Sequence, residues 1–195
     1  QHTSSIGYEV GATIGYNFNS KLALRTGFQF NVRQYNIHAY VQDPEQTSIA
    51  IVSNNSTSLF PVVSGFRSGP NTAPVVLKNR NYELSMPISI DWRPVGSGKF
   101  MIGFAAGLQP TYKFDKEPFI ISANYKNYAD GSALMRNWNL NANFESYVSY
   151  KAGDYRLQVG PQLRYQLKPT MSYSYPIKEF LFDYGIKVGF VKSLK

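Results

Sequence analysis

The sequence predicts an all-β fold, an up-and-down antiparallel transmembrane β-barrel of the eight-stranded type, and three observations lead to it. Apolar and polar residues alternate strictly over stretches of up to about fourteen residues. A period of two is that of a strand, whose successive side chains leave on opposite faces. These stretches are much longer than the roughly five or six residues of an ordinary strand. Short turns also alternate with long loops along the chain, as in barrels that cross a membrane.

Seven strands are visible, and residues 1–195 are expected to form one domain. We expect the strands at 6–18, 22–41, 81–93, 100–114, 136–150, 155–168 and 182–190. Tight turns are expected near residues 20, 96 and 152. The long connections, expected to be irregular loops, are about 42–79, 115–135 and 169–179.

The clearest alternation lies on either side of the turn at 151–154. Before the turn, Trp138 and Phe144 share one parity and a ladder of asparagines holds the other; after it, the apolar parity resumes with Leu157. Two such runs around a short glycine-containing turn predict a hairpin.

Strand 22–41 and the residues after it interrupt the pattern. The apolar parity flips past Gln34, which predicts a β-bulge. Residues 42–79 contain four prolines and a polar cluster of Ser, Asn and Thr, a composition typical of a loop. Short apolar pieces around Ile49 and Val62 are expected to pair as a small outer hairpin.

Two orientations of the wall compete: a soluble, lipocalin-like barrel has its apolar face inside, and a membrane barrel has it outside. Each strand carries about six or seven bulky apolar side chains on one face. An eight-stranded barrel has room inside for little more than small side chains or one small ligand. The opposite face, rich in Gly, Ser, Thr and Asn, fits that space. The sequence therefore favours a membrane barrel, located in the bacterial outer membrane.

Charged residues on the face of small side chains then point into the lumen, with both signs mixed. Charges removed from bulk water are tolerated when they are paired, so we expect an ion-pair network, with Glu145 and Arg156 as a candidate pair. We favour a structural network that fills the lumen over an ion pathway, because an open channel needs a wider barrel. The expected members are Glu9, Arg25, Arg33, Glu83, Asp91, Glu145, Arg156, Arg164, Asp183 and Lys187.

Aromatic residues near the strand ends are expected to lie at the two membrane interfaces. They are Tyr8, Trp92, Tyr112, Trp138, Tyr150, Tyr155 and Tyr165. The net charge of +8 suits anionic lipid. Loop-side cations such as Arg136 and Lys178 are candidates to contact lipopolysaccharide phosphates, although solvated surface charge is the favoured explanation of any single one. Lys and Arg are scattered along the chain, which disfavours nucleic acid as a partner.

The sequence offers no motif for catalysis, metal binding or a cofactor. It has no Cys and two His, of which His2 lies at the start and His38 at the loop end of a strand. Neither has the partner pattern of a metal site or of a Ser/His/Asp triad. We expect no cofactor and no enzymatic activity; an outer-membrane enzyme using His38 is the less favoured alternative.

The first and last expected strands, 6–18 and 182–190, both run toward the turn end of the wall. A barrel closes only when its first and last strands pair, and bacterial barrels normally have an even strand count. We therefore expect one further strand, upstream of Gln1 or supplied otherwise.

Several stretches resemble outer-membrane β-barrel domains of Bacteroidota, and the likeness covers nearly the whole chain. The stretches are 108–112, 120–128, 136–139, 158–167, 175–179 and 182–189. Some proteins of this kind resemble dual-membrane-spanning regulators of the anti-sigma type, in which the barrel is the C-terminal domain. The resemblance implies a signalling role and an upstream source for the missing strand, and it supplies no catalytic residue.

The favoured function is a non-enzymatic barrel that is anchored in the outer membrane and presents loops 42–79 and 115–135 for envelope sensing or partner binding. The alternative is an accessory subunit of a larger outer-membrane complex for assembly, secretion or uptake. Its partners would be other outer-membrane or periplasmic proteins.

Overall fold

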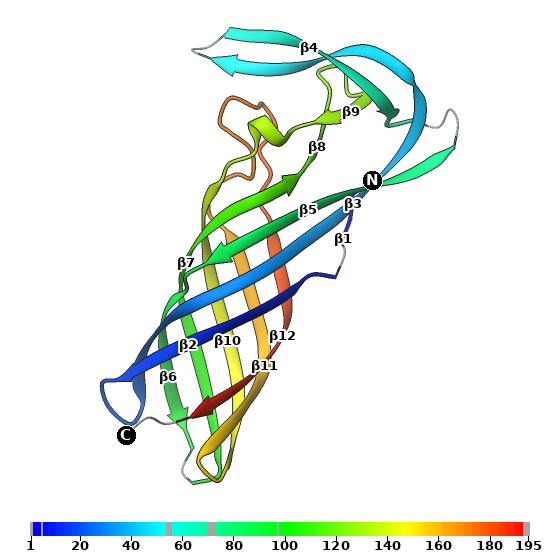
Figure 1. Ribbon diagram of the computed structural model, residues 1–195. Coiled ribbons are helices and arrows are strands. Elements are labelled where there is room, and N and C mark those ends of the chain that lie inside the picture. Colours follow the sequence, from blue (N-terminus) through cyan, green and yellow to red (C-terminus); the bar gives the residue numbers. More distant parts are fainter. Residues whose placement is uncertain (1, 5, 54–55, 70–72, 97, 193–195) are drawn as a thin grey trace.

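The computed structural model describes residues 2–4, 6–53, 56–69, 73–96 and 98–192, and most of them belong to one antiparallel sheet (Figure 1). Within these ranges the strands are β1 His2–Ser4, β2 Tyr8–Asn17, β3 Leu22–Ser53, β4 Ser56–Arg67, β5 Pro74–Ser85, β6 Ile88–Val95, β7 Phe100–Glu117, β8 Phe119–Ile121, β9 Asn127–Asp130, β10 Trp138–Ala152, β11 Tyr155–Gln166 and β12 Phe182–Lys192. The helical content of the described residues is one 3-10 turn, Ser132–Leu134. No helix in the described part of the chain is long and apolar enough to cross a membrane.

The curved wall in the lower part of Figure 1 follows the order β2, β3, β5 with β6, β7, β10, β11 and β12. β3 keeps one register from its pairing with β6 into its pairing with β5, so β5 and β6 are one wall strand interrupted at Met86 and Pro87. Proline has no N–H to contribute to the ladder. β2 and β12 are the two edges of the wall and both run toward the turn end. The predicted antiparallel all-β fold is confirmed.

The predicted count of seven strands is wrong for the described part of the chain, because much of the expected loops 42–79 and 115–135 is strand. β3 continues to Ser53, β4 returns beside it, and β8 pairs with β9. Ile49 pairs with Phe60 and Thr47 with Val62, so the predicted small outer hairpin is confirmed. Prolines are compatible with strands at the edge of a sheet. The loop that the proline-rich composition of 42–79 predicted is therefore wrong over much of this range.

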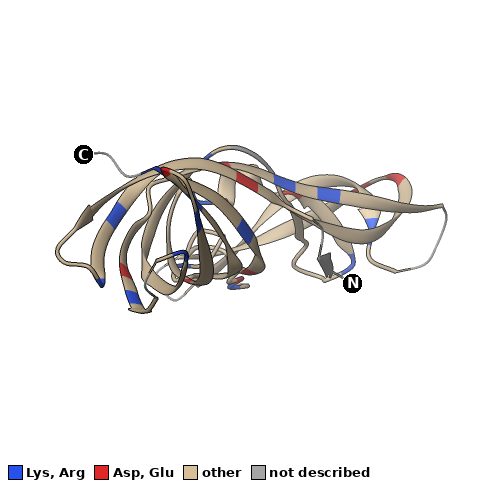
Figure 2. Cartoon of the chain, turned by 90° about the horizontal axis from the view of Figure 1, so that it is seen from below, with Lys and Arg blue, Asp and Glu red and all other residues tan. Residues whose placement is uncertain are grey.

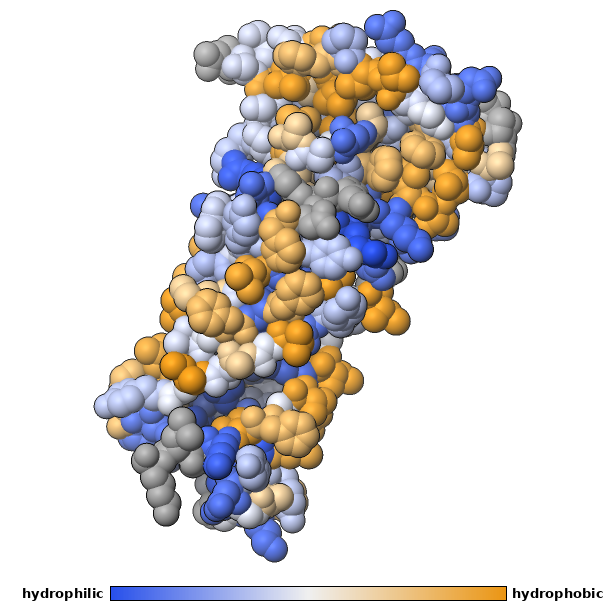
Figure 3. Space-filling model, in the orientation of Figure 1, coloured by the Kyte–Doolittle hydropathy of each residue, from blue (hydrophilic) through white to orange (hydrophobic). Residues whose placement is uncertain are grey.

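The wall has its polar face inside, the reverse of a lipocalin-like barrel. Inward side chains such as Thr111 and Asn141 are 0% exposed, whereas outward ones such as Leu108 and Val148 are 47% and 48% exposed. Figure 3 shows hydrophobic side chains over the outside of the wall and hydrophilic ones at its lower, turn end. This is the arrangement that a hydrocarbon environment requires.

The β-bulge predicted past Gln34 is wrong. The register of β3 against β5 is unbroken from the pair Gln29–Ser85 to the pair Tyr40–Pro74. Arg33 and Ile37 are both buried on the same side of the strand. The strand therefore stays regular as far as Tyr40, and the interior that it faces changes from polar to apolar; its irregularity lies further on, between Val41 and Glu45 against β4.

Candidate functional site: the lumen and its cap

The charged residues of the wall occupy several strands, as Figure 2 shows from the turn end, and they form clusters at successive heights of the lumen. The lowest, which we call the turn-end cluster, is centred on Asp91 of β6, whose side chain is fully buried. Arg25 of β3 lies 3.0 Å from one carboxylate oxygen, and Arg93 Nε donates to the same oxygen at 2.7 Å. The Tyr147 hydroxyl donates to the other oxygen at 2.6 Å and accepts from Arg25 Nη2 at 2.8 Å. Asp91 is thus paired and hydrogen-bonded on both oxygens, the condition for burying a charge.

Sequence reasoning missed Tyr147, although a signal for it exists. Ser146 and Tyr147 reverse the alternation of β10, so that the serine takes the outward parity and the tyrosine the inward one. The ring needs space on the neighbouring strand, which Gly103 of β7 provides: a Cβ there would lie 2.3 Å from the Tyr147 ring. An aromatic residue at the inward parity and a glycine directly opposite together mark this position.

The candidate pair Glu145–Arg156 is wrong. Glu145 lies 3.7 Å from Arg25 and forms an ion pair with Lys187 of β12. Arg156 donates instead to the hydroxyl of Ser149 at 3.4 Å. Glu145 and Arg156 are not opposite each other in the β10–β11 ladder and therefore lie at different heights.

At mid-height, Glu9 of β2 forms an ion pair with Arg164 of β11. Gln109 donates to Gln29 at 2.9 Å across the same level. A cavity of about 10 Å³ lies next to these groups, and another of about 30 Å³ lies beside Tyr147 and Lys187; Glu145 lines both. The larger cavity therefore has room for water beside these polar groups.

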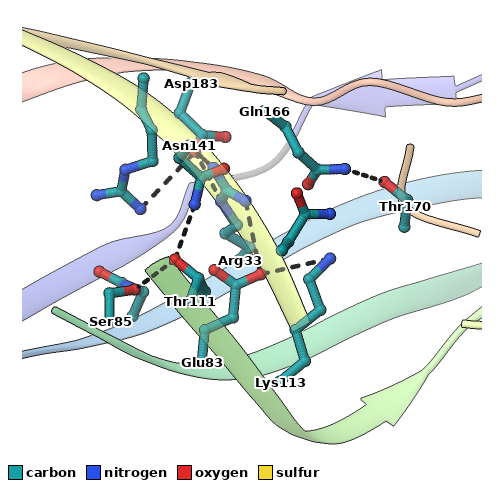
Figure 4. A network of polar contacts seen from close by, with 12 residues as sticks. Arg33, Glu83, Ser85, Thr111, Lys113, Asn141, Gln166, Thr170 and Asp183 are labelled. Atoms are coloured by element: carbon teal, nitrogen blue, oxygen red, sulfur yellow. Dashed lines mark hydrogen bonds and ion pairs between the residues drawn. The ribbon is translucent and has the colours of Figure 1, made fainter. Parts of the chain in front are cut away.

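The loop-end cluster of the lumen contains Arg33, Glu83, Lys113 and Asp183 (Figure 4). Arg33 donates from Nε to Asp183 at 2.6 Å and lies 3.5 Å from Glu83. Lys113 Nζ lies 3.6 Å from the same oxygen of Glu83, and both of these side chains are fully buried. Lys113, like Arg93, was not among the predicted members of the network.

A chain of amides and hydroxyls runs beside this cluster. Asn31 donates to the Ser85 hydroxyl at 2.6 Å, Ser85 and Thr111 share a hydrogen bond of 2.9 Å, and Asn141 donates to Thr111 at 2.8 Å. These side chains come from β3, β5, β7 and β10, which are neighbours in the sheet, so the hydrogen bonds run from strand to strand along the inner face of the wall (Figure 4).

The aromatic residues singled out in the sequence lie on the outer face. Trp138 is 66% exposed, and its ring centre is 5.0 Å from that of Tyr112 near the loop end of the wall. Tyr150 packs on Phe100 at the turn end, with ring centres also 5.0 Å apart. The exposed outward aromatics of the set also include Tyr8, Trp92, Tyr155 and Tyr165.

Above the loop-end cluster, the extended strands build a cap, which comprises β4, β8, β9, the distal part of β3, the first residues of β5 and the segments 132–135 and 169–179. Its lower core lies directly beyond the lumen and contains Ile37, Ala39, Leu77 and Tyr128. Its upper core contains Ile49, Ile120, Ala129, Met135, Met171 and Tyr175. The cap therefore covers the loop end of the lumen with apolar side chains.

Hydrogen bonds tie the cap to the wall and to itself. Asn79 of β5 donates to the carbonyl of Phe119 at 3.3 Å and accepts from its N–H at 3.0 Å. The Tyr175 hydroxyl donates to the carbonyl of Ile121 at 2.9 Å. Burial raises the pKa of Tyr175 to about 12, although the hydrogen bond to Ile121 acts in the opposite direction and lowers this pKa. Burial, together with the nearby Glu179 carboxylate, also raises the pKa of Tyr35.

His38 lies on β3 opposite Val76, with an exposed side chain on the side away from the lumen. Among the described residues, no group of three or more His, Asp or Glu side chains is arranged to hold a metal ion. The charged groups of the lumen therefore neutralise one another. The cap adds a folded region above them.

Comparison with known proteins gives one finding. A protein-family model described as "Outer membrane protein beta-barrel domain" matches residues 1–190. No curated protein and no solved structure matches the chain.

Proposed function

This chain belongs to the outer membrane protein β-barrel domain family, and from that premise we propose that it is a non-enzymatic platform, whose cap recognises a ligand or partner at the cell surface. Residence in the bacterial outer membrane follows from the family. The proposed role is envelope sensing or partner binding, with the barrel as anchor and the lumen filled.

The observation that carries this proposal is the change of interior along β3. Below Tyr35 the strand contributes charged and amide side chains to the lumen, and above it the same face contributes Ile37 and Ala39 to an apolar core. An apolar core is what a segment surrounded by water needs in order to fold. This apolar core supports the proposal that the chain folds a structure outside the membrane, which anchoring alone does not require.

The outer side of the cap offers a surface for recognition. On β4, Leu59 and Val63 are 62% and 69% exposed, and their ladder partners are Ala50 and Gln46. They lie on the face opposite to Ile49, which is in the upper core. Exposed apolar side chains on a polar surface are common at binding sites.

The absence of catalysis is part of the proposal. The lumen carboxylates of Asp91, Glu83 and Glu9 are each committed to an arginine or lysine. His38 faces away from these carboxylates. A His38→Ala variant is expected to keep every function of the protein, and loss of an activity in that variant would favour the enzyme instead.

The test is photo-cross-linking in intact cells from position 59 or 63 of the full chain, with position 151, in β10 close to the turn at the other end, as the control. We expect an adduct from the cap positions and none from position 151. The double variant Leu59→Asp/Val63→Asp is expected to lose the adduct while it keeps the heat-modifiable gel mobility of a folded barrel. A cap that gives no adduct at either position would contradict the proposal.

A second candidate, an accessory subunit of a larger outer-membrane complex, is favoured by the two wall edges. Outward side chains there are more exposed than in the middle of the wall: Ile186 and Phe190 of β12 are each 80% exposed, and Ile14 of β2 is 71% exposed. Unpaired strand edges are costly in hydrocarbon. Cysteine cross-linking from position 14 or 186 separates the candidates, because a subunit would form an adduct with a different protein.

A further inference from the structure

A cluster of two cations around one exposed tyrosine lies at the loop end of β10, outside both the lumen and the cap cores. The Arg136 guanidinium carbon is 3.9 Å from the centre of the Tyr173 ring, and Lys178 Nζ is 5.5 Å from it. Tyr173 is 63% exposed. A cation over an aromatic face is favourable, so the ring holds two like charges close together on the surface.

Both cations are held in place by backbone carbonyls. Arg136 Nε donates to the carbonyl of Met171 at 3.2 Å, and the Arg136 N–H donates to the carbonyl of Thr170 at 3.1 Å. Lys178 Nζ donates to the carbonyls of Tyr173 and Tyr175 at 2.8 and 2.6 Å. These bonds leave the two terminal guanidinium nitrogens and one ammonium hydrogen for a ligand.

Neither cation has a carboxylate partner among the salt bridges of the described residues. Glu179, the next residue after Lys178, directs its carboxylate toward the Tyr35 hydroxyl at 3.4 Å. Asp130 is engaged with the N–H and hydroxyl of Ser132. The cluster therefore carries positive charge that the rest of the described chain does not neutralise.

The height of the cluster relative to the membrane is set by the aromatic residues beside it. Arg136 lies two residues before Trp138, the first residue of β10, and Trp138 packs on Tyr112. Tyr165 and Phe180 stack with ring planes 10° apart close to the same end of the wall. Trp and Tyr gather at the headgroup level of a membrane. The cations therefore lie just beyond the hydrocarbon, where lipid phosphates are found.

We propose that Arg136 and Lys178, which both lie against the ring of Tyr173, bind the phosphate groups of a phosphorylated glycolipid in the outer leaflet. The planar guanidinium supplies two parallel donors to a phosphate, and the ammonium beside the same ring supplies a donor to a phosphate oxygen of the same glycolipid. The inference depends on the membrane location of the barrel and is independent of what the cap recognises.

The experiment uses the full chain in phosphatidylcholine vesicles that contain a small fraction of bisphosphorylated lipid A, with retained lipid measured by native mass spectrometry. Wild type is expected to retain bisphosphorylated lipid A. It is not expected to retain lipid A from which the phosphates have been removed. The variant Arg136→Gln/Lys178→Gln is expected to bind at least about tenfold more weakly, since it removes charge-assisted hydrogen bonds. The matched control, Lys99→Gln/Lys151→Gln, removes the same charge at the turn end and is expected to bind as wild type does.

Two conservative variants distinguish lipid binding from a purely structural role of the cluster. Lys178→Arg is expected to retain lipid binding, and Arg136→Lys to weaken it, because lysine lacks the paired donors. Equal binding by wild type and the double Gln variant, or equal loss in the turn-end control, would overturn the proposal. Complete displacement of lipid A by inorganic phosphate would also overturn it, because the site would then be one for free anions.

Discussion

The wall and the cap use the same strands to enclose interiors of opposite chemistry. On β5, the inner face carries Glu83, Asn81 and Asn79 in the wall and then Leu77 in the cap, all of them buried. The pairing of β5 with β3 does not mark the change, because it stays in register from Gln29–Ser85 to Tyr40–Pro74; the one register shift of β5 lies against β7, between Tyr82 and Glu83. The comparison shows that the surroundings decide which face of a strand is apolar: with lipid outside, polar groups turn inward and pair, and with water outside, apolar groups turn inward and pack.

The largest effect is expected from removing a lumen charge. Glu83→Ala leaves Lys113 and Arg33 buried beside an empty site, and loss of one partner of a buried pair costs about 3–5 kcal/mol. Urea unfolding in lipid vesicles, followed by heat-modifiable mobility, measures the loss. The matched variant Glu83→Leu/Lys113→Met removes both charges and is expected to recover much of it. Wild-type stability in Glu83→Ala would show that the lumen tolerates unpaired charge.

Two substitutions on β5, one in the cap and one in the wall, test the difference between the two regions directly. Leu77→Asn places an amide in the apolar core of the cap and is expected to cost about 3 kcal/mol through lost packing and an unpaired polar group. Asn81→Leu changes a wall position where neither polar atom of the side chain has a hydrogen-bond partner among the described residues. That variant is expected to cost less than about 1 kcal/mol. Equal costs at the two positions would contradict the distinction between wall and cap.

Packing inside the wall is expected to be as demanding as packing in the cap, although the groups are polar. Gly103→Ala puts a methyl group where the Tyr147 ring lies and is expected to cost about 2 kcal/mol by pushing the hydroxyl away from Asp91. Adding Tyr147→Leu frees the space and should relieve the clash but not restore the hydrogen bond. If Gly103→Ala is neutral, the lumen is looser than a packed interior.

The smallest effect concerns the cap at alkaline pH. Tyr175 has a pKa raised from 10.0 to about 12, so its neutral form is favoured in the folded state. Its contribution is complete below pH 10 and is lost as the pH rises through about 12. Protease resistance of the cap should fall over that range. Tyr175→Phe is expected to cost about 1 kcal/mol at neutral pH through the lost bond to Ile121 and to make the alkaline loss shallower. An identical pH profile in wild type and Tyr175→Phe would assign the loss to other tyrosines.

Alternation in the sequence was enough to predict the wall, because a period of two directly reports which face of a strand each side chain takes. The cap was harder to predict. A flip of apolar parity past Gln34 is also what a bulge produces, and the sequence alone does not say where lipid gives way to water. The prolines of 42–79 favoured a loop, yet Pro61 and Pro74 lie within β4 and β5.

The inward residues could be predicted, whereas their partners could not. Pairing across a lumen depends on the height at which each strand places its residues, and this is set by strand register. In the β10–β11 ladder Glu145 is opposite Gln162 and Arg156 is opposite Lys151, so the expected pair is separated along the barrel axis. Contacts between distant strands, such as Arg33 with Asp183, depend in addition on the curvature of the whole sheet.

The two edge strands place a simple arithmetic condition on closure. In an antiparallel sheet the direction reverses at every step, and here β2 and β12 point the same way. An antiparallel closure of the wall therefore takes an odd number of additional strands between them, the smallest being a single one that runs toward the loop end. A direct contact between β2 and β12 would have to be parallel. The orientation of the edges thus restricts any strand that closes the wall, whichever polypeptide supplies it.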